Sequence, residues 1–185
     1  MRKNFGPKSW MYPLPVLMIG TYNADGTPDV MNAAWGGISE EAEISICVDD
    51  GHKTAENLQA RKAFTVSFAT ADYVTECDYL GVVSGNKVPD KVARAGFHTV
   101  KSEFVDAPVV VELPMTLECE VVSYDIPTCR LVGRIVNVSA DESILTDEAV
   151  DPAKLRPITY DPVHHDYRVL GDVVGKAFSD GLKLK

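Results

Sequence analysis

The chain has 185 residues, of which 45% are hydrophobic and 24% are charged. These proportions are typical of a soluble globular protein, and the length suits one domain with its own core, so we expect a single domain over residues 1–185. Acidic residues outnumber basic residues by 27 to 18, which gives a net charge of -9. Such a surface repels polyanions and anionic lipids, which argues against nucleic-acid and membrane partners but still allows a local site for one phosphate.

The amino terminus and the cysteines indicate a cytoplasmic protein. Two basic residues follow the initial methionine, but no apolar signal-peptide region comes after them, and the apolar stretch Leu14–Gly20 is too short to span a bilayer. Cys47, Cys77, Cys119 and Cys129 show no CxxC spacing and are too few for a disulfide scaffold. Buried free thiols in a reducing compartment are therefore favoured over a redox pair.

The first half of the chain predicts short strands with helices between them. Four apolar or alternating runs are expected to form strands over residues 16–22, 29–34, 43–48 and 64–68. Asp25-Gly26 lies between the first two runs and is a strong hairpin signal. Thr54 is expected to cap a helix over residues 55–60, and Asp72 is expected to cap a second helix.

The second half is more plainly β. Strands are expected over residues 109–111, 115–124 and 131–138, after a short helix near residues 90–95 that ends at Gly96. Residues 141–155 are expected to be helical or irregular, and the tail from Tyr160 to Lys185 need not be regular. The pattern predicts a mainly β fold, an antiparallel barrel with a few short helices. No strand–GxGxxG–helix or GxxxxGK[ST] motif supports a Rossmann or P-loop nucleotide site.

Two segments have residue types that suit a ligand. The run Asn32-Ala33-Ala34-Trp35-Gly36-Gly37 follows a strand; its small residues would let a flat ligand approach the backbone, with Trp35 as a wall. Periodicity alone favours the alternative in which Trp35 is core and the glycines form a turn. His52-Lys53-Thr54 at a helix start combines amides, a hydroxyl and an ammonium suited to phosphate, although a simple N-cap beside a solvated lysine is the commoner meaning.

Two further segments are weaker candidates. Ser84-Gly85-Asn86-Lys87, followed by Asp90-Lys91, could close over a polar cofactor, but a solvated surface loop is the commoner meaning. Tyr167 could stack on a ligand, or its segment could simply pack on the barrel. The four histidines show no metal-binding spacing and no nucleophile elbow is present, so neither a metal site nor a Ser/His/Asp triad is expected.

Seven short motifs occur in one order along the chain. They are Pro13-x-Pro15-Val16, Asp25-Gly26-x-Pro28, Asn32-Ala33-Ala34-Trp35-Gly36, Lys53-Thr54-x-x-Asn57-Leu58, Ser84-Gly85 with Asp90-Lys91, Ala107-Pro108-Val109-x-x-Glu112-x-Pro114, and Tyr167-x-x-Leu170-Gly171. The ordered series resembles the flavin reductase-like family, and especially its flavoredoxin-like branch. The resemblance implies an FMN-binding split β-barrel, an antiparallel Greek-key barrel that forms homodimers with FMN at the subunit interface.

The resemblance also implies a cofactor-binding set. Its members are Asn32, Ala33, Ala34, Trp35, His52, Lys53, Thr54, Ser84, Asp90, Lys91 and Tyr167. The first four would hold the edge of the isoalloxazine ring, largely through backbone groups. Lys53 and Thr54 would bind the FMN phosphate, with His52 beside them. Ser84, Asp90 and Lys91 would lie near the cofactor, and Tyr167 would close the pocket.

Three functions follow from this resemblance. The first is an FMN-dependent oxidoreductase that takes hydride from NADH or NADPH and passes it to a small acceptor; it needs no catalytic side chain, because the flavin does the redox chemistry. The second is an electron carrier that holds FMN without nicotinamide-dependent turnover, its acidic surface docking on a basic partner protein. The third is a barrel that has lost its cofactor and serves a structural role. The sequence does not separate NADH from NADPH, nor does it name the acceptor.

Overall fold

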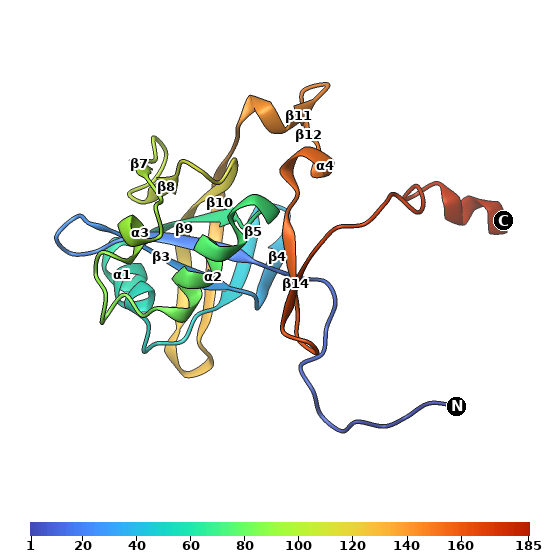
Figure 1. Cartoon of the computed structure of the whole chain (residues 1–185), viewed down its shortest axis with the longest axis horizontal. Helices are drawn as coiled ribbons and strands as arrows, with labels where there is room; N and C mark the ends of the chain where they lie inside the picture. The colour runs from blue at the N-terminus through green and yellow to red at the C-terminus, as the bar shows by residue number, and fades with distance from the viewer.

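The main feature of the computed structural model, which describes residues 1–185, is a seven-stranded antiparallel sheet (Figure 1). Its strands, in spatial order, are β3 (Pro28–Ala33), β2 (Leu17–Tyr22), β6 (Ala63–Phe68), β9 (Met115–Asp125), β10 (Arg130–Ala140), β5 (Glu43–Cys47) and β4 (Gly36–Glu40). All neighbouring pairs are antiparallel. The sheet curls into a half barrel with β3 and β4 at its two edges, which confirms the predicted mainly β, antiparallel class.

Strand β2 is buried on both faces. It pairs with β3 from Leu17 opposite Ala33 to Tyr22 opposite Pro28, so the Asp25-Gly26 hairpin forms as predicted. Leu17 and Ile19 point into the barrel interior, whereas Met18 packs on the outer layer of the sheet. Burial on both faces explains why this strand is an almost unbroken apolar run rather than an alternating one.

The barrel interior is filled by one apolar cluster. Its buried members are Leu17, Ile19, Met31, Ala33, Ile44, Ile46, Val48, Ala55, Leu58, Phe64, Val66, Leu117, Cys119 and Leu131. The alternation predicted for residues 43–48 is confirmed, because Ile44, Ile46 and Val48 all lie inside. Gly133 on β10 makes room for the Phe64 ring, since a side chain there would overlap that ring. The absence of a Cβ at this position therefore lets the widest interior side chain pack against the sheet.

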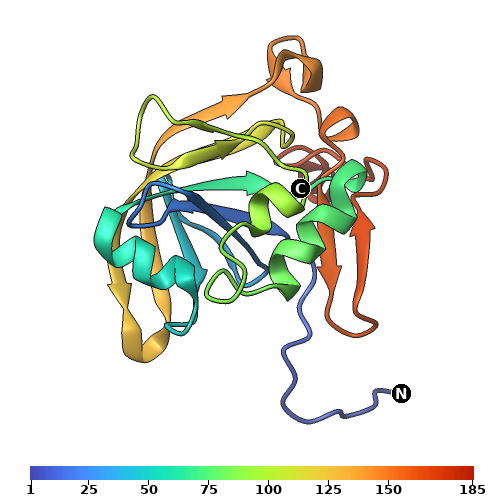
Figure 2. The same cartoon turned by 60° about the vertical axis from the view of Figure 1, so that its left-hand side comes forward.

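Three helices surround the β2–β3 hairpin (Figure 2). They are α1 (Lys53–Arg61), α2 (Val74–Val82) and α3 (Lys91–Arg94). The helices were predicted, but the caps predicted for two of them, Thr54 and Asp72, are wrong. His52 occupies the N-cap position of α1, and the Thr54 hydroxyl donates to the buried carboxylate of Asp29 instead of capping. Asp72 lies in the 3-10 turn Ala71–Tyr73 and pairs with Arg156. In both cases a distant partner on another element competes successfully with the local cap.

The outer face of the sheet has its own core. Its largest members come from β2, β3, α2, α3 and the segment after α3, and include Met18, Val30, Leu80, Val92 and Phe97. The chain leaves α3 at Gly96, where a φ of +79° confirms the predicted stop. Two short strands, β7 (Thr99–Lys101) and β8 (Pro108–Val110), then pair with each other. This outer layer packs α2 and α3 firmly against β3.

The tail from Tyr160, for which no regular structure was required, begins with a hairpin. Strands β13 (Ile158–Asp161) and β14 (Asp166–Val169) pair with each other, and β13 also pairs with β1 (Leu14–Pro15). The buried carboxylate of Asp161 stabilises the connection by accepting the backbone N–H groups of Val163 and His164. Residues 141–155 form the small ladder β11 (Leu145–Thr146) and β12 (Ala149–Val150), then α4 (Pro152–Leu155).

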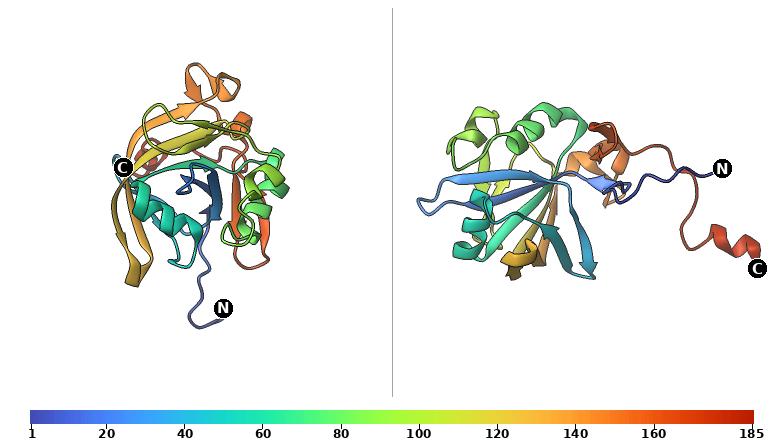
Figure 3. Two further views of the ribbon diagram at one scale, coloured as in Figure 1. Left: turned by 90° about the vertical axis from the view of Figure 1, so that its left-hand side faces the viewer. Right: turned by 90° about the horizontal axis from the view of Figure 1, so that it is seen from below.

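Both chain ends leave the barrel on the same side (Figures 1 and 3). The tail beyond Val169 extends away from the body and ends in a 3-10 turn over Asp180–Leu184. Its apolar side chains Val173, Val174 and Phe178 are fully exposed. None of the helices has the length and apolar character that a membrane crossing requires.

Candidate functional site

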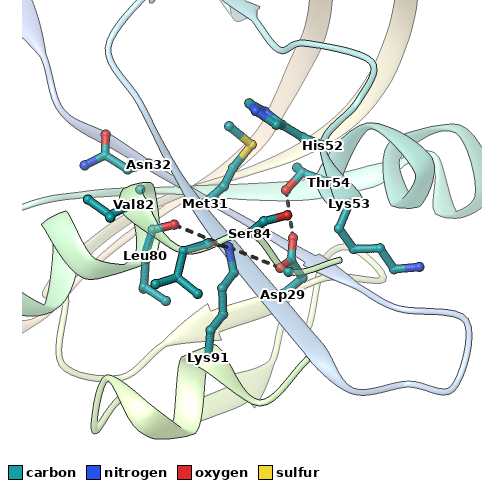
Figure 4. A pocket seen from close by; sticks show the side chains of 13 residues that line it. Asp29, Met31, Asn32, His52, Lys53, Thr54, Leu80, Val82, Ser84 and Lys91 are labelled. Carbon is teal, nitrogen blue, oxygen red and sulfur yellow. Dashed lines mark hydrogen bonds and ion pairs between the residues drawn. The ribbon is translucent and has the colours of Figure 1, made fainter. Parts of the chain in front are cut away.

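Three adjoining pockets meet at Asn32, close to the end of β3. The α1 pocket, of about 200 Å³, is lined by Asp29, Met31, Asn32, His52, Lys53, Thr54, Leu80, Gly81, Val82, Val83, Ser84, Gly85 and Lys91 (Figure 4). The Trp35 pocket, of about 330 Å³, is lined by Met31, Asn32, Ala33, Ala34, Trp35, Cys47, Asp49, His52 and Cys129. The Tyr167 pocket, of about 240 Å³, is lined by Val16, Asn32, Ala34, Asp78, Gly81, Tyr160 and Tyr167.

This groove gathers almost every residue of the predicted cofactor-binding set. All members except Asp90 line at least one of the three pockets, although they come from β3, α1, the loop after α2, α3 and β14. Asp90 lies outside the groove, where its exposed carboxylate accepts from Arg94 at 2.9 Å. Asp90 precedes α3, so the structure turns its side chain towards the next helical turn instead of the groove.

A buried ion pair lies at the wall of the α1 pocket. Asp29 and Lys91 are each 3% exposed, and the Lys91 ammonium lies 3.4 Å from one Asp29 oxygen. The other oxygen of Asp29 accepts from the Thr54 hydroxyl at 2.7 Å. Burial lowers the pKa of Lys91 and the Asp29 carboxylate opposes that shift. The sequence analysis missed Asp29; the available signal was an acidic residue next to the apolar pair Val30-Met31 in a strand.

The start of α1 supplies groups that suit an anion. The amides of Lys53 and Thr54 open the helix and have no partner carbonyl within it, and the helix dipole adds positive potential there. The Lys53 ammonium is bonded to the exposed Glu56 at 2.9 Å. The Ser84-Gly85 loop faces this helix end, and Asn86 anchors the loop by donating to the Gly51 carbonyl at 3.0 Å.

Gly85 is required by the packing of that loop. A Cβ at this position would overlap the Asp29 carboxylate and would lie 3.2 Å from the Cβ of Lys53. The loop backbone therefore lies directly against the buried ion pair on one side and the start of α1 on the other. In the Ser84-Gly85 motif, the absence of a side chain at Gly85 allows this close approach.

The Tyr167 pocket contains a tyrosine bonded to a carboxylate. The Tyr167 hydroxyl donates to Asp78 on α2 at 2.6 Å, which ties the β13–β14 hairpin to that helix. Burial, followed by the Asp78 carboxylate, raises the pKa of Tyr167, so its hydroxyl stays protonated at neutral pH. Asp78 was not predicted, and no local motif marks it.

The Trp35 pocket is open, and the thiols of Cys47 and Cys129 line it. Trp35 is 58% exposed, so the alternative in which it belongs to the core is wrong.

Cys77 and Cys119 are buried as predicted, and burial raises the pKa of each thiol to about 12. The prediction of a buried thiol is wrong for Cys47, which lies on the outward face of β5, the face opposite Ile44 and Ile46.

The fold and groove together define a class: an antiparallel split barrel with a helix amino terminus beside pockets lined partly by small residues. The family model for the flavin reductase like domain matches residues 10–163. The chain therefore belongs to the flavin reductase-like family, as the ordered motifs predicted.

Solved structures agree with this assignment. Flavoredoxin of Desulfovibrio vulgaris (Miyazaki F) is 36% identical, with a TM-score of 0.93 over 98% of this chain and 100% of that chain. Flavoredoxin from Methanosarcina acetivorans is 27% identical, with a TM-score of 0.90 over the whole of both chains. By sequence alone, the chain is also 27% identical to the uncharacterized protein YdfE of Bacillus subtilis (strain 168), over 95% of this chain and 93% of that protein.

Proposed function

We propose that the chain binds FMN along the three-pocket groove and passes reducing equivalents through it as a flavin reductase-like oxidoreductase. One observation carries the proposal: three pockets that share Asn32 run from the amino-terminal end of α1 to residues that include alanine, tryptophan and tyrosine. FMN has a matching shape, with a phosphate at one end and a planar ring at the other. The family assignment and the two flavoredoxin structures support the same cofactor.

The residues present fit this cofactor. The α1 pocket would take the phosphate, with the amides that open α1 and the Lys53 ammonium as donors. Ala33 and Ala34 leave space for a planar ring to lie against the backbone, with Trp35 on one side. Tyr167 would close the ring end from the Tyr167 pocket.

When bound, FMN would supply the redox chemistry, which is hydride transfer between NADH or NADPH and a small acceptor. This chain's own residues would bind the phosphate and orient the ring. The Tyr167 hydroxyl, held by Asp78, keeps its proton at neutral pH and stays a donor towards Asp78. No side chain of the groove is assigned a catalytic role.

We further propose that residues 1–185 form a single domain and that the protein is a cytoplasmic homodimer. Beside the Trp35 pocket, an apolar hollow of about 510 Å³ is lined by residues of the amino-terminal arm and β4, including Trp10, Met11, Trp35 and Ile38. Strand β4 is a sheet edge, and the carboxy-terminal tail exposes further apolar side chains. A second copy of the chain would cover these surfaces and enclose the ring end of the groove.

The names of two close relatives favour a second candidate, a flavoredoxin-like electron carrier. In this case the protein would hold FMN and exchange electrons with a partner protein, without turnover by nicotinamides. The net charge of -9 suits docking to a basic partner.

The first test is a visible absorption spectrum of the purified protein, before and after incubation with FMN and removal of excess. Retained flavin bands and a rise in melting temperature with FMN are expected, because a ligand of the native state stabilises it. A protein that neither retains FMN nor is stabilised by it would contradict both candidates and favour the barrel that has lost its cofactor.

The second test separates the two candidates. Anaerobic mixing of the FMN-loaded protein with NADH or NADPH is expected to bleach the flavin bands on a catalytic timescale if the chain is a reductase. Bleaching by a reduced redox partner protein, with none by either nicotinamide, would identify the electron carrier. The same preparation measured by light scattering at several concentrations tests the homodimer.

A further inference from the structure

We infer that Asp29 is a positioning residue: it joins Thr54 and Lys91 so that the two walls of the α1 pocket stay at a fixed spacing. On this assignment neither the Thr54 hydroxyl nor the Lys91 ammonium binds the phosphate. The inference rests on the proposed FMN function and changes the roles that family resemblance implies for Thr54 and Lys91.

The Thr54 hydroxyl already donates its hydrogen bond within the protein. It has one hydrogen, and it donates that hydrogen to Asp29 Oδ2 at 2.7 Å, because a carboxylate oxygen can only accept. The side chain is 1% exposed. An ionised phosphate is also only an acceptor, so Thr54 can offer it the backbone amide but not the hydroxyl.

The Lys91 ammonium also donates within the protein. It donates to the Leu80 carbonyl at 3.3 Å and the Val83 carbonyl at 3.2 Å, and it forms an ion pair with Asp29 Oδ1 at 3.4 Å. Figure 4 shows the ammonium directed towards Asp29 and the Leu80 carbonyl. Lys91 therefore neutralises the carboxylate and satisfies the carbonyl end of α2.

Asp29 is the common partner of these groups, which lie on different elements. It lies on β3, Thr54 opens α1, and Lys91 opens α3 and holds the last turn of α2. The Ser84-Gly85 loop connects α2 to α3 and lies against the same carboxylate at Gly85. Fixing Asp29 therefore fixes the loop relative to the start of α1, and these are the two walls of the pocket.

The Asp29→Asn variant separates this arrangement from direct phosphate binding, because the two arrangements predict opposite changes in FMN affinity. If Thr54 and Lys91 were phosphate ligands, the variant would remove a negative charge beside the phosphate and release both donors, and FMN would bind more tightly. If Asp29 is a positioning residue, the variant loosens the pocket and FMN binds more weakly. Riboflavin lacks the phosphate and reports on the ring end alone.

The experiment is a fluorescence titration of FMN and of riboflavin into wild-type protein, Asp29→Asn and Asp106→Asn. Asp106 is a partly exposed carboxylate outside the groove, so its variant controls for net charge. We expect Asp29→Asn to weaken FMN about tenfold and riboflavin by less than about twofold, with Asp106→Asn unchanged. An FMN-to-riboflavin affinity ratio that stays the same or rises in Asp29→Asn overturns the inference.

A second readout needs no cofactor. Amide hydrogen exchange of cofactor-free protein, followed by mass spectrometry, is expected to be faster across residues 83–91 in Asp29→Asn and, to a smaller extent, in Thr54→Val. Thr54→Val keeps the side-chain shape and also serves if Asp29→Asn does not fold. Unchanged exchange in residues 83–91 in the folded variants overturns the positioning role. A wild-type protein that binds neither flavin overturns the proposed function instead, and the exchange result still decides the role of Asp29.

Discussion

The α1 pocket and the Trp35 pocket are built in opposite ways. The α1 pocket is supported by buried, mutually paired polar groups, with Asp29, Thr54 and Lys91 each no more than 3% exposed. The Trp35 pocket is open: Trp35 and Cys47 are exposed, and the neighbouring arm and β4 carry apolar side chains facing solvent. The α1 pocket is thus complete within a single chain. The Trp35 pocket is open, and in our proposal a flavin ring and a second copy of the chain would cover it.

Paired buried charges are costly to disturb, because removing one partner leaves the other uncompensated. Exposed aromatic side chains can be removed with little effect on folding. Substitutions in the α1 pocket are therefore expected to change both stability and binding, and those in the Trp35 pocket mainly binding.

The largest contrast is expected in thiol reactivity. At pH 8 Cys47 is expected to react with a thiol reagent first, and Cys77 and Cys119 about a thousandfold more slowly, because their raised pKa values and burial suppress the thiolate. Mass spectrometry of the labelled peptides measures this order. FMN is expected to slow labelling of Cys47; labelling that FMN leaves unaffected would argue against a ring in the Trp35 pocket.

The next largest effect is expected for Gly85→Ala. Its methyl group would overlap the Asp29 carboxylate, which is held by two partners and cannot move aside freely. We expect a loss of about 1–3 kcal/mol in unfolding free energy and an FMN affinity at least about tenfold weaker. Urea unfolding and flavin titration measure the two effects. Gly181→Ala, where a methyl group meets open space, is the matched control and is expected to be neutral.

Tyr167→Phe tests how the ring end is held. The variant deletes the hydroxyl that donates to Asp78, and a loss of about 1–2 kcal/mol in unfolding free energy is expected. Tyr22→Phe changes a half-buried tyrosine and serves as the control. Equal, small losses in both variants would mean that the Tyr167–Asp78 bond contributes little.

The same tyrosine predicts a pH dependence. The pKa of Tyr167 is raised in the folded protein, so above about pH 10, where an unfolded tyrosine ionises, the folded state binds more protons. Stability is therefore expected to fall as pH rises above about 10. Urea midpoints measured between pH 8 and pH 11 are expected to fall less steeply in Tyr167→Phe, and parallel curves would contradict the assignment.

The smallest effect on folding is expected for Trp35→Ala. Because the side chain is 58% exposed, the unfolding free energy is expected to change by about 0.5 kcal/mol or less. Loss of an aromatic wall is expected to weaken FMN about threefold to tenfold and riboflavin equally. A change confined to FMN would place Trp35 near the phosphate instead of the ring.

Local patterns predicted most of the fold. The Asp25-Gly26 hairpin and the alternation of Ile44, Ile46 and Val48 appear as expected, because turn chemistry and one-sided burial leave direct traces in neighbouring residues. The caps assigned to Thr54 and Asp72 failed, since each side chain instead bonds to a residue far away in the chain. The β13–β14 hairpin was missed because its stability depends on Asp161 and on pairing with β1.

The sequence by itself determined the mainly β class and the family, and nearly all the residues that it singled out line the groove, because turns, periodicity and an ordered motif series are local features. Only the tertiary structure decided that Trp35 is exposed, that Asp90 lies outside the groove, and that Asp29 joins Thr54 to Lys91. These facts depend on contacts between β3, α1 and α3, whose residues are distant in the chain. The order of neighbouring residues does not show from which buried donor a carboxylate will accept a hydrogen bond.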